Sequence, residues 1–143
     1  MGIGDKASGP TGYSGTPLSK KLGIKPGFHI KLVNAPEYYL RLFTDLPAEM
    51  YFENEEIKNI DLIHLFTKSR DEYETLLPVL KTRIKSNGII WVSWPKKASK
   101  VPTDITEDII RNFALQTGLV DIKVCAVDDV WSGLKLVIPV KDR

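Results

Sequence analysis

The sequence predicts a single α/β domain, with helices on both faces of a mostly parallel sheet and an antiparallel strand at its C-terminal end. Short apolar runs alternate with helical segments, which is typical of a layered α/β fold. The last two apolar runs are joined only by "DDVWSG", which favours an antiparallel pair. A length of 143 residues fits one domain, which we assign to residues 13–143. Residues 1–12 are rich in glycine and proline and are expected to form a flexible tail.

The first half of the chain should contain a short helix and two strands. Thr16 is a candidate N-cap, Pro17 suits a first helical position, and Gly23 suits a helix stop. A strand is expected over residues 28–34, and "APEYYLRLFTDL" leaves room for only a brief helix before Pro47. The second strand is expected at "EMYFE".

A short link separates this second strand from the strongest strand candidate of the chain. "EMYFE" ends near Glu53, and the strand Ile60–Thr67 begins seven residues later. A parallel crossover that contains a helix needs at least ~10 residues. No helix is therefore expected in this link.

The second half should alternate helices and strands. Ser69 and Glu72 have capping-box spacing at the start of a helix that we expect to end at Asn87-Gly88, directly before a buried strand at "GIIWVSW".

A second capping pair, Asp104 and Glu107, should start the next helix, and Gly118 should end it. Pro139 marks the last strand as an edge of the sheet, because proline cannot donate a ladder hydrogen bond.

The composition disfavours several functional classes. The 20 basic and 18 acidic residues give a net charge of +2, so nucleic-acid binding is not expected. Cys125, His29 and His64 are too few for a Cys/His metal cluster, and no metal site is expected. We interpret Cys125 as a buried strand thiol and His64 as a hydrogen-bonded core residue. The sequence contains no secretory signal and no apolar run of the ~18 residues that span a bilayer, so we expect a soluble cytoplasmic protein without membrane contact.

Several stretches carry a resemblance to a known family. "GYSGTPLSKKLGIKPG", "NAPE", "WPKK", "TDITED" and "GLVDIKVCAVDDVWSGLKLV" are similar to a bacterial domain-of-unknown-function family of small, degenerate methyltransferase-like proteins. From about Leu22 onward, the order of turns, strands and helices also resembles the class I S-adenosylmethionine-dependent methyltransferase fold. The resemblance implies a Rossmann-like three-layer domain with a truncated methyltransferase topology, and it implies no known activity.

The sequence departs from the methyltransferase pattern around the expected cofactor pocket. Class I enzymes follow their first strand with a glycine-rich loop, whereas this chain has Asn34, Ala35 and Pro36 there. They also hold the ribose with an acidic residue at the end of the second strand, a position that Glu53 matches. The short link after Glu53 leaves no room for the helix and third strand of the complete fold. We therefore expect no cofactor, and S-adenosylmethionine remains the alternative.

Candidate ligand-binding residues follow from the predicted sheet. Ligands of open parallel sheets lie outside the carboxyl ends of the strands, near the point where strand order reverses. The residues expected at this end are Asn34, Lys68, Arg70, Trp94, Lys96, Lys97 and Trp131. The four cations among them, together with two helix N-termini, would favour an anion. The alternative is that the cations are solvated in loops and the tryptophans pack in the core.

The sequence does not reveal catalytic residues or a reaction. The preferred interpretation is a non-catalytic Rossmann-like module that binds a small anionic or nucleotide-like ligand, or a partner protein, at the carboxyl ends of its strands. One alternative is a methyltransferase with a reduced pocket. Another is nucleic-acid binding through a set of lysines, namely Lys20, Lys21, Lys96, Lys97 and Lys100.

Overall fold

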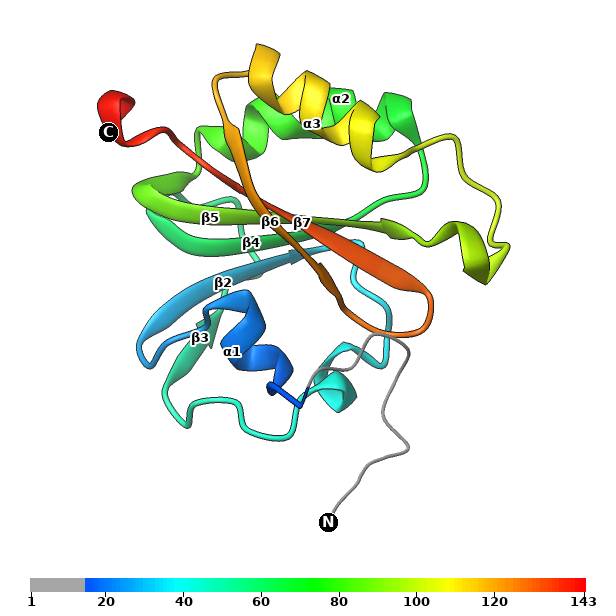
Figure 1. Ribbon diagram of the computed structural model, residues 1–143. Coiled ribbons are helices and arrows are strands. Elements are labelled where there is room, and N and C mark those ends of the chain that lie inside the picture. The colour runs from blue at the N-terminus through cyan, green and yellow to red at the C-terminus, as the bar shows by residue number, and fades with distance from the viewer. Residues whose placement is uncertain (1–14) are drawn as a thin grey trace.

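The computed structural model describes residues 15–143, and the expected tail at residues 1–12 lies outside them. Figure 1 shows a six-stranded sheet with the order β3-β2-β4-β5-β7-β6. Its strands are β2 (Phe28–Val33), β3 (Met50–Phe52), β4 (Ile60–Phe66), β5 (Ile84–Pro95), β6 (Val120–Ala126) and β7 (Trp131–Val137). The helices are α1 (Leu18–Leu22), α2 (Arg70–Lys81) and α3 (Glu107–Gln116), and the 3₁₀ turns are η1 (Tyr39–Leu42), η2 (Lys97–Ser99) and η3 (Val140–Asp142).

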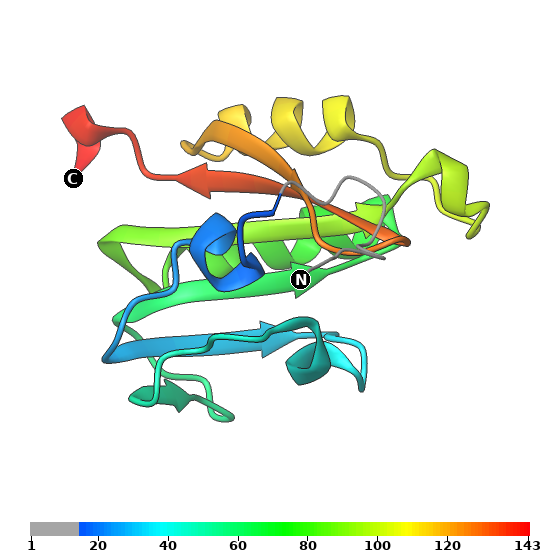
Figure 2. The ribbon, with the colours of Figure 1, turned by 60° about the horizontal axis from the view of Figure 1, so that its bottom comes forward.

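The topology confirms the predicted fold class. Strands β3, β2, β4 and β5 are parallel, whereas β7 is antiparallel to both β5 and β6. Helices α2 and α3 lie on one face of the sheet and α1 lies on the other, as Figures 1 and 2 show. The expected central strands are adjacent and parallel, in the order β2, β4, β5. The link between β3 and β4 contains neither a helix nor a strand, as its length predicted.

Two predicted boundaries are wrong. Pro139 does not mark an edge strand, because β7 ends at Val137 and is enclosed by β5 and β6. Asn87-Gly88 does not end a helix, because α2 ends at Lys81 and β5 has already begun at Ile84.

A bulge explains the second error. Ile60 pairs with Ile84 but Leu62 pairs with Ile89, so β5 has extra residues at this point. Gly88 is needed there, since a Cβ on it would lie 2.8 Å from Ile84 Cβ.

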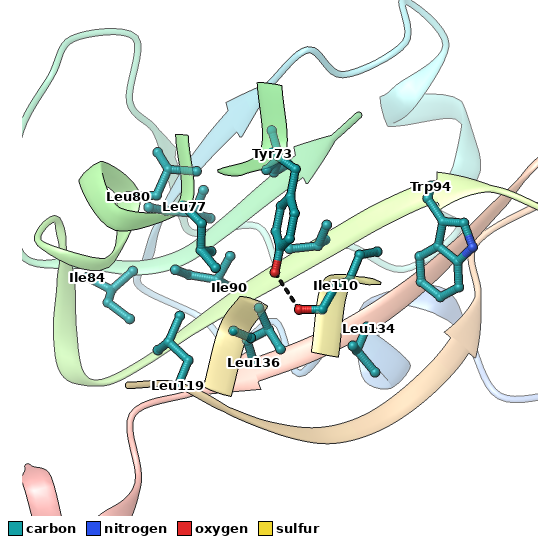
Figure 3. Packing of buried hydrophobic residues seen from close by; sticks show 14 of the residues in the cluster. Tyr73, Leu77, Leu80, Ile84, Ile90, Trp94, Ile110, Leu119, Leu134 and Leu136 are labelled. Carbon is teal, nitrogen blue, oxygen red and sulfur yellow. Dashed lines mark hydrogen bonds between the residues drawn. The ribbon is translucent and has the colours of Figure 1, made fainter. Parts of the chain in front are cut away.

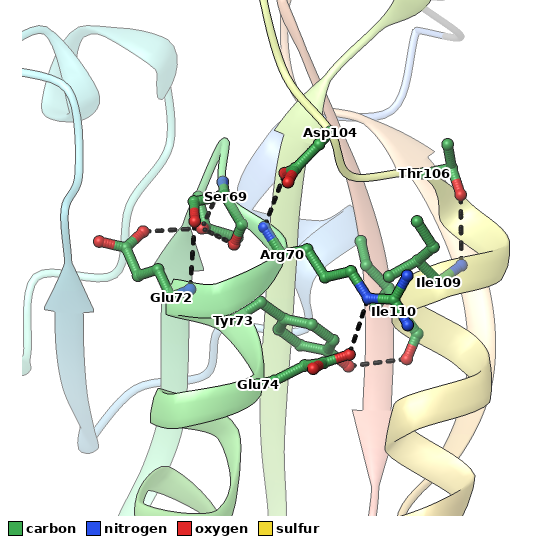
Figure 4. A network of polar contacts seen from close by, with 10 residues as sticks. Ser69, Arg70, Glu72, Tyr73, Glu74, Asp104, Thr106, Ile109 and Ile110 are labelled. Atoms are coloured by element: carbon green, nitrogen blue, oxygen red, sulfur yellow. Dashed lines mark hydrogen bonds and ion pairs between the residues drawn. The ribbon is translucent and has the colours of Figure 1, made fainter.

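The helix caps are partly as predicted. Ser69 Oγ accepts a hydrogen bond from Glu72 N at 3.2 Å, which confirms the cap of α2. Asp104 does not cap α3, because Thr106 occupies that position. Figure 4 shows that Asp104 instead accepts a hydrogen bond from Arg70 N, at 2.8 Å, at the start of α2. Asp104 therefore stabilises the N-terminus of the neighbouring helix.

The remaining helix ends follow the same physical rules. Helix α1 has Pro17 rather than Thr16 as its N-cap, with no side-chain cap hydrogen bond. It ends at Gly23, and the region after α3 contains Gly118; both glycines have a positive φ, which glycine adopts without strain.

The sheet separates two apolar cores. The core under α2 and α3 is shown in Figure 3 and includes Tyr73, Leu77, Ile90, Ile110 and Leu136. The core under α1 and η1 includes Leu22, Tyr39, Phe66, Trp91 and Trp131. No helix of the described part of the chain has the length and apolar character needed to cross a bilayer.

Candidate functional site

A pocket of about 500 Å³ lies at the carboxyl ends of β2 and β4. Its lining residues are Asn34, Pro36, Phe66, Thr67, Lys68, Ser69, Glu72 and Trp131. From β2 the chain continues outward to β3, whereas β4 lies on the other side of β2 and leads to β5. The pocket therefore occupies the point where strand order reverses, which is the usual ligand position in open α/β sheets.

The loop after β2 forms one wall. Asn34 has a φ of 59°, and asparagine is among the few non-glycine residues that adopt this left-handed conformation readily. Two residues later, Pro36 O accepts a hydrogen bond from Tyr39 N at 3.0 Å, which begins η1. A sharp turn without glycine thus stands where a methyltransferase would have a glycine-rich loop.

An aromatic wall joins this loop to the β6–β7 hairpin. Trp131 Nε1 donates to Tyr38 Oη at 3.2 Å, and Tyr38 Oη donates to Asp128 Oδ2 at 2.9 Å. Asp128 Oδ1 also accepts from Trp131 N at 2.7 Å, which shapes the hairpin turn. Phe66 packs edge-on against Trp131 with ring centroids 5.0 Å apart. These contacts fix the Trp131 side chain from several directions.

The third wall is polar and follows β4. Thr67 is buried, and its Oγ1 donates to Glu72 Oε1 at 2.7 Å. Lys68 is exposed at the mouth, and its carbonyl oxygen accepts from Thr103 Oγ1 at 2.7 Å. The pocket lining thus includes both an acidic and a basic residue, Glu72 and Lys68.

The structure brings three of the seven predicted residues together at this pocket: Asn34, Lys68 and Trp131. Trp94 lies in the α2/α3 core, as Figure 3 shows, because it alternates to the sheet face opposite Trp131. Its burial agrees with the packing alternative.

The other three predicted cations do not line the pocket. The Arg70 side chain pairs with Glu74 at 3.0 Å along α2. Lys96 and Lys97 lie beyond the end of β5, where Lys96 N donates to Val130 O at 2.7 Å. A role of these residues in ligand binding remains a prediction.

Sequence reasoning missed part of the site. Tyr38 was not recognised, because no local pattern joins it to Asp128, which lies 90 positions further along the chain. Glu72 was recognised only as a helix-cap residue, although its side chain turns towards Thr67. Thr67 was expected at this end of the central strand, from the polar residues of "FTKS".

His64 is a buried structural residue, as predicted. Its Nδ1 lies 3.0 Å from Tyr39 Oη and its Nε2 lies 2.7 Å from Ser93 Oγ. Burial lowers the pKa of His64 to about 3, so the ring is neutral near pH 7. Since His64 and Ser93 have no exposed surface, this Ser-His contact is out of reach of a substrate.

The chain is similar in fold to solved structures that are described as methyltransferases. A proposed type 11 methyltransferase from Sulfolobus solfataricus has a TM-score of 0.61 at 12% identity, covering 85% of this chain and 89% of that chain. An S-adenosylmethionine-dependent methyltransferase from Aquifex aeolicus has a TM-score of 0.58 at 15% identity, with coverages of 85% and 88%. A ribosomal protein L11 methylase from Lactobacillus delbrueckii subsp. bulgaricus has a TM-score of 0.54 at 10% identity, with coverages of 83% and 73%.

The structural similarity shows a class I methyltransferase-like fold. At such low sequence identities it does not show an activity or a substrate. A comparison with protein-family profiles found no match, and a comparison with curated protein sequences found none either.

The residues of this chain fit S-adenosylmethionine poorly. The turn after β2 has side chains and a proline where the cofactor would need open backbone. Glu53, the candidate ribose ligand, is held by His29, with Oε2 and Nδ1 2.6 Å apart. The link from Glu53 to β4 supplies no strand or helix to enclose an adenine.

Proposed function

We propose that this chain is a binding module whose ligand occupies the pocket at the carboxyl ends of β2 and β4. The observation that carries the proposal is the position of the pocket at the reversal of strand order. The turn after β2 lies on one side of the pocket, and the N-terminal turn of α2 lies on the other. A volume of about 500 Å³ is in the range of small-molecule sites.

The lining supports a small ligand that combines an anionic group with a flat ring. Lys68 provides the cation at the mouth, and the Asn34 amide can donate or accept hydrogen bonds. Trp131 and Phe66 provide an aromatic wall. A nucleotide has both parts. The N-terminus of α2 contributes less than the sequence suggested, because Asp104 and Ser69 already accept from its N–H groups.

The test is calorimetric titration with ADP and AMP of the wild type, Lys68→Ala and a Lys96→Ala/Lys97→Ala double variant. Loss of one charge-assisted contact should weaken binding about tenfold in Lys68→Ala. The double variant distinguishes the pocket from the outer rim, and wild-type affinity is expected for it. Unchanged affinity in Lys68→Ala, or no binding by the wild type, would refute the assignment.

The second candidate is S-adenosylmethionine-dependent methyl transfer, with a reduced pocket. The fold comparisons support it better than they support a binding module, because the similar structures are methyltransferases. The cofactor loop and the engaged Glu53 argue against it. Titration with S-adenosylmethionine decides between the two candidates.

A further inference from the structure

A second polar groove lies between α1 and β6, away from the pocket just described. Its volume is about 410 Å³, and its lining includes Thr16, Lys20, Lys21, Lys123 and Cys125. Helix α1 supplies two of these lysines and the edge strand β6 supplies the third. The groove does not share a lining residue with the β2–β4 pocket.

Hydrogen bonds to the sheet and to a loop hold α1 in place beside the groove. Trp91 Nε1, buried in the sheet, donates to Leu22 O at 2.9 Å. Ser19 Oγ donates to Asp45 Oδ1 at 2.7 Å. One buried and one partly buried hydrogen bond therefore hold this five-residue helix beside the sheet.

The positive charge of the groove extends to two further lysines, Lys25 and Lys135. Lys123 is directly opposite Lys135 in the β6–β7 ladder. Burial lowers the pKa of Lys135, and the positive charges of Lys123 and Lys25 lower it further. Burial raises the pKa of the Cys125 thiol, whereas Lys21 and Lys123 act in the opposite direction. No carboxylate contributes to either shift.

Four of these lysines form no ion pair with the part of the chain that the structure describes. Within residues 15–143, no ion pair contains Lys20, Lys25, Lys123 or Lys135. Like charges placed close together repel, and a bound anion would replace that repulsion with attraction. A chain whose net charge is only +2 has concentrated cations at this groove.

We propose that the α1–β6 groove is a second binding site, for a small molecule that carries two or more phosphate groups. Several ammonium groups around one hollow suit a multivalent anion, since each can donate to a different oxygen. The size of the groove limits the occupant to a compact molecule.

Tripolyphosphate is the probe, in a low-salt buffer without phosphate. We expect calorimetric binding to the wild type that is at least ~10-fold weaker in Lys20→Gln/Lys123→Gln, because two charge-assisted contacts are lost. Lys58→Gln/Lys141→Gln is the matched control, with two exposed lysines changed elsewhere, and should bind as the wild type does. Lys68→Ala should also keep the wild-type affinity, which separates this site from the β2–β4 pocket.

Cys125 provides an independent readout, because it is the only cysteine in the sequence and lines the groove. It is only partly buried, whereas the sequence suggested a buried thiol. Tripolyphosphate should slow its alkylation by iodoacetamide several-fold in the wild type and the control, but not in the groove variant. Equal affinity in the wild type and the groove variant would overturn the proposal. So would tighter binding of single-stranded DNA than of tripolyphosphate, lost in the same variant, which would indicate a nucleic-acid surface instead.

Discussion

The two faces of the sheet are covered very differently. One face carries α2 and α3, of 12 and 10 residues, over an apolar core. The other carries α1, of five residues, and the single turn η1. The face covered by α1 and η1 also has buried hydrogen bonds. Trp91 Nε1 donates to Leu22 O, and His64 lies between Tyr39 and Ser93. Hydrogen bonds can thus add to apolar packing in holding a short helix against the sheet.

The comparison explains why the fold resembles a methyltransferase while the cofactor region does not. The half with β4, β5, α2 and α3 is complete, and it supplies one wall of the pocket. In the half with β2 and β3, a 3₁₀ turn follows β2, and the link that follows β3 contains no helix or strand. The missing elements are those next to the loop and acidic residue that would hold the cofactor.

The largest expected difference comes from a matched pair of leucines that are both fully buried. Leu77→Ala under α2 should cost about 4 kcal/mol in the free energy of unfolding, because long helices cannot close the cavity. Leu22→Ala in α1 should cost about 2–3 kcal/mol, since a short helix can move inward. Urea denaturation measures both. A greater cost for Leu22→Ala would contradict the comparison.

His64 should give the face covered by α1 and η1 a pH dependence. Burial lowers the pKa of His64 to about 3, whereas an unfolded histidine has about 6.5. The unfolded state therefore takes up the proton first, so stability is full above pH ~6.5 and falls towards pH ~3, by at most about 1.4 kcal/mol per unit.

His64→Leu should remove this contribution and also cost about 2 kcal/mol at pH 7, because Tyr39 and Ser93 lose their partner. Subtracting the variant's stability profile from that of the wild type isolates His64 from the carboxylates. If the stabilities of the wild type and the variant changed with pH in the same way between pH 6.5 and 4, His64 would not be a buried neutral histidine.

The smallest expected effect concerns two tyrosine hydroxyls. Tyr73 Oη donates to Ile110 O at 2.7 Å and links α2 to α3 in Figure 4, so Tyr73→Phe should cost about 1 kcal/mol. Tyr38→Phe at the pocket should cost less, because that hydroxyl is partly exposed, but it should shift tryptophan fluorescence by releasing Trp131. A larger stability loss for Tyr38→Phe would reverse the ranking.

The fold was largely predictable because it depends on local signals. Apolar runs, connection lengths and the Ser69 cap correctly located the central strands and the start of α2. The errors arose where tertiary contacts decide. Asp104 had the spacing of a local cap but bonds to another helix, and Gly88 serves a bulge.

The candidate site was predictable only in part. Residues that directly follow a strand, such as Asn34 and Lys68, were found. Lys96 and Lys97 also follow a strand, but β5 ends at Pro95 and the chain continues into η2 rather than into the pocket. Which strand ends face a common pocket is set by the strand order and the loop paths, which the sequence does not encode locally.

The most direct test of our proposal that this methyltransferase-like fold does not hold the cofactor is calorimetric titration of the wild type with S-adenosylmethionine. The crowded turn at Asn34 and the pairing of Glu53 with His29 predict no binding tighter than ~10 µM, which corresponds to about −7 kcal/mol. A saturable titration with a dissociation constant below ~10 µM would contradict the account and favour the methyltransferase candidate.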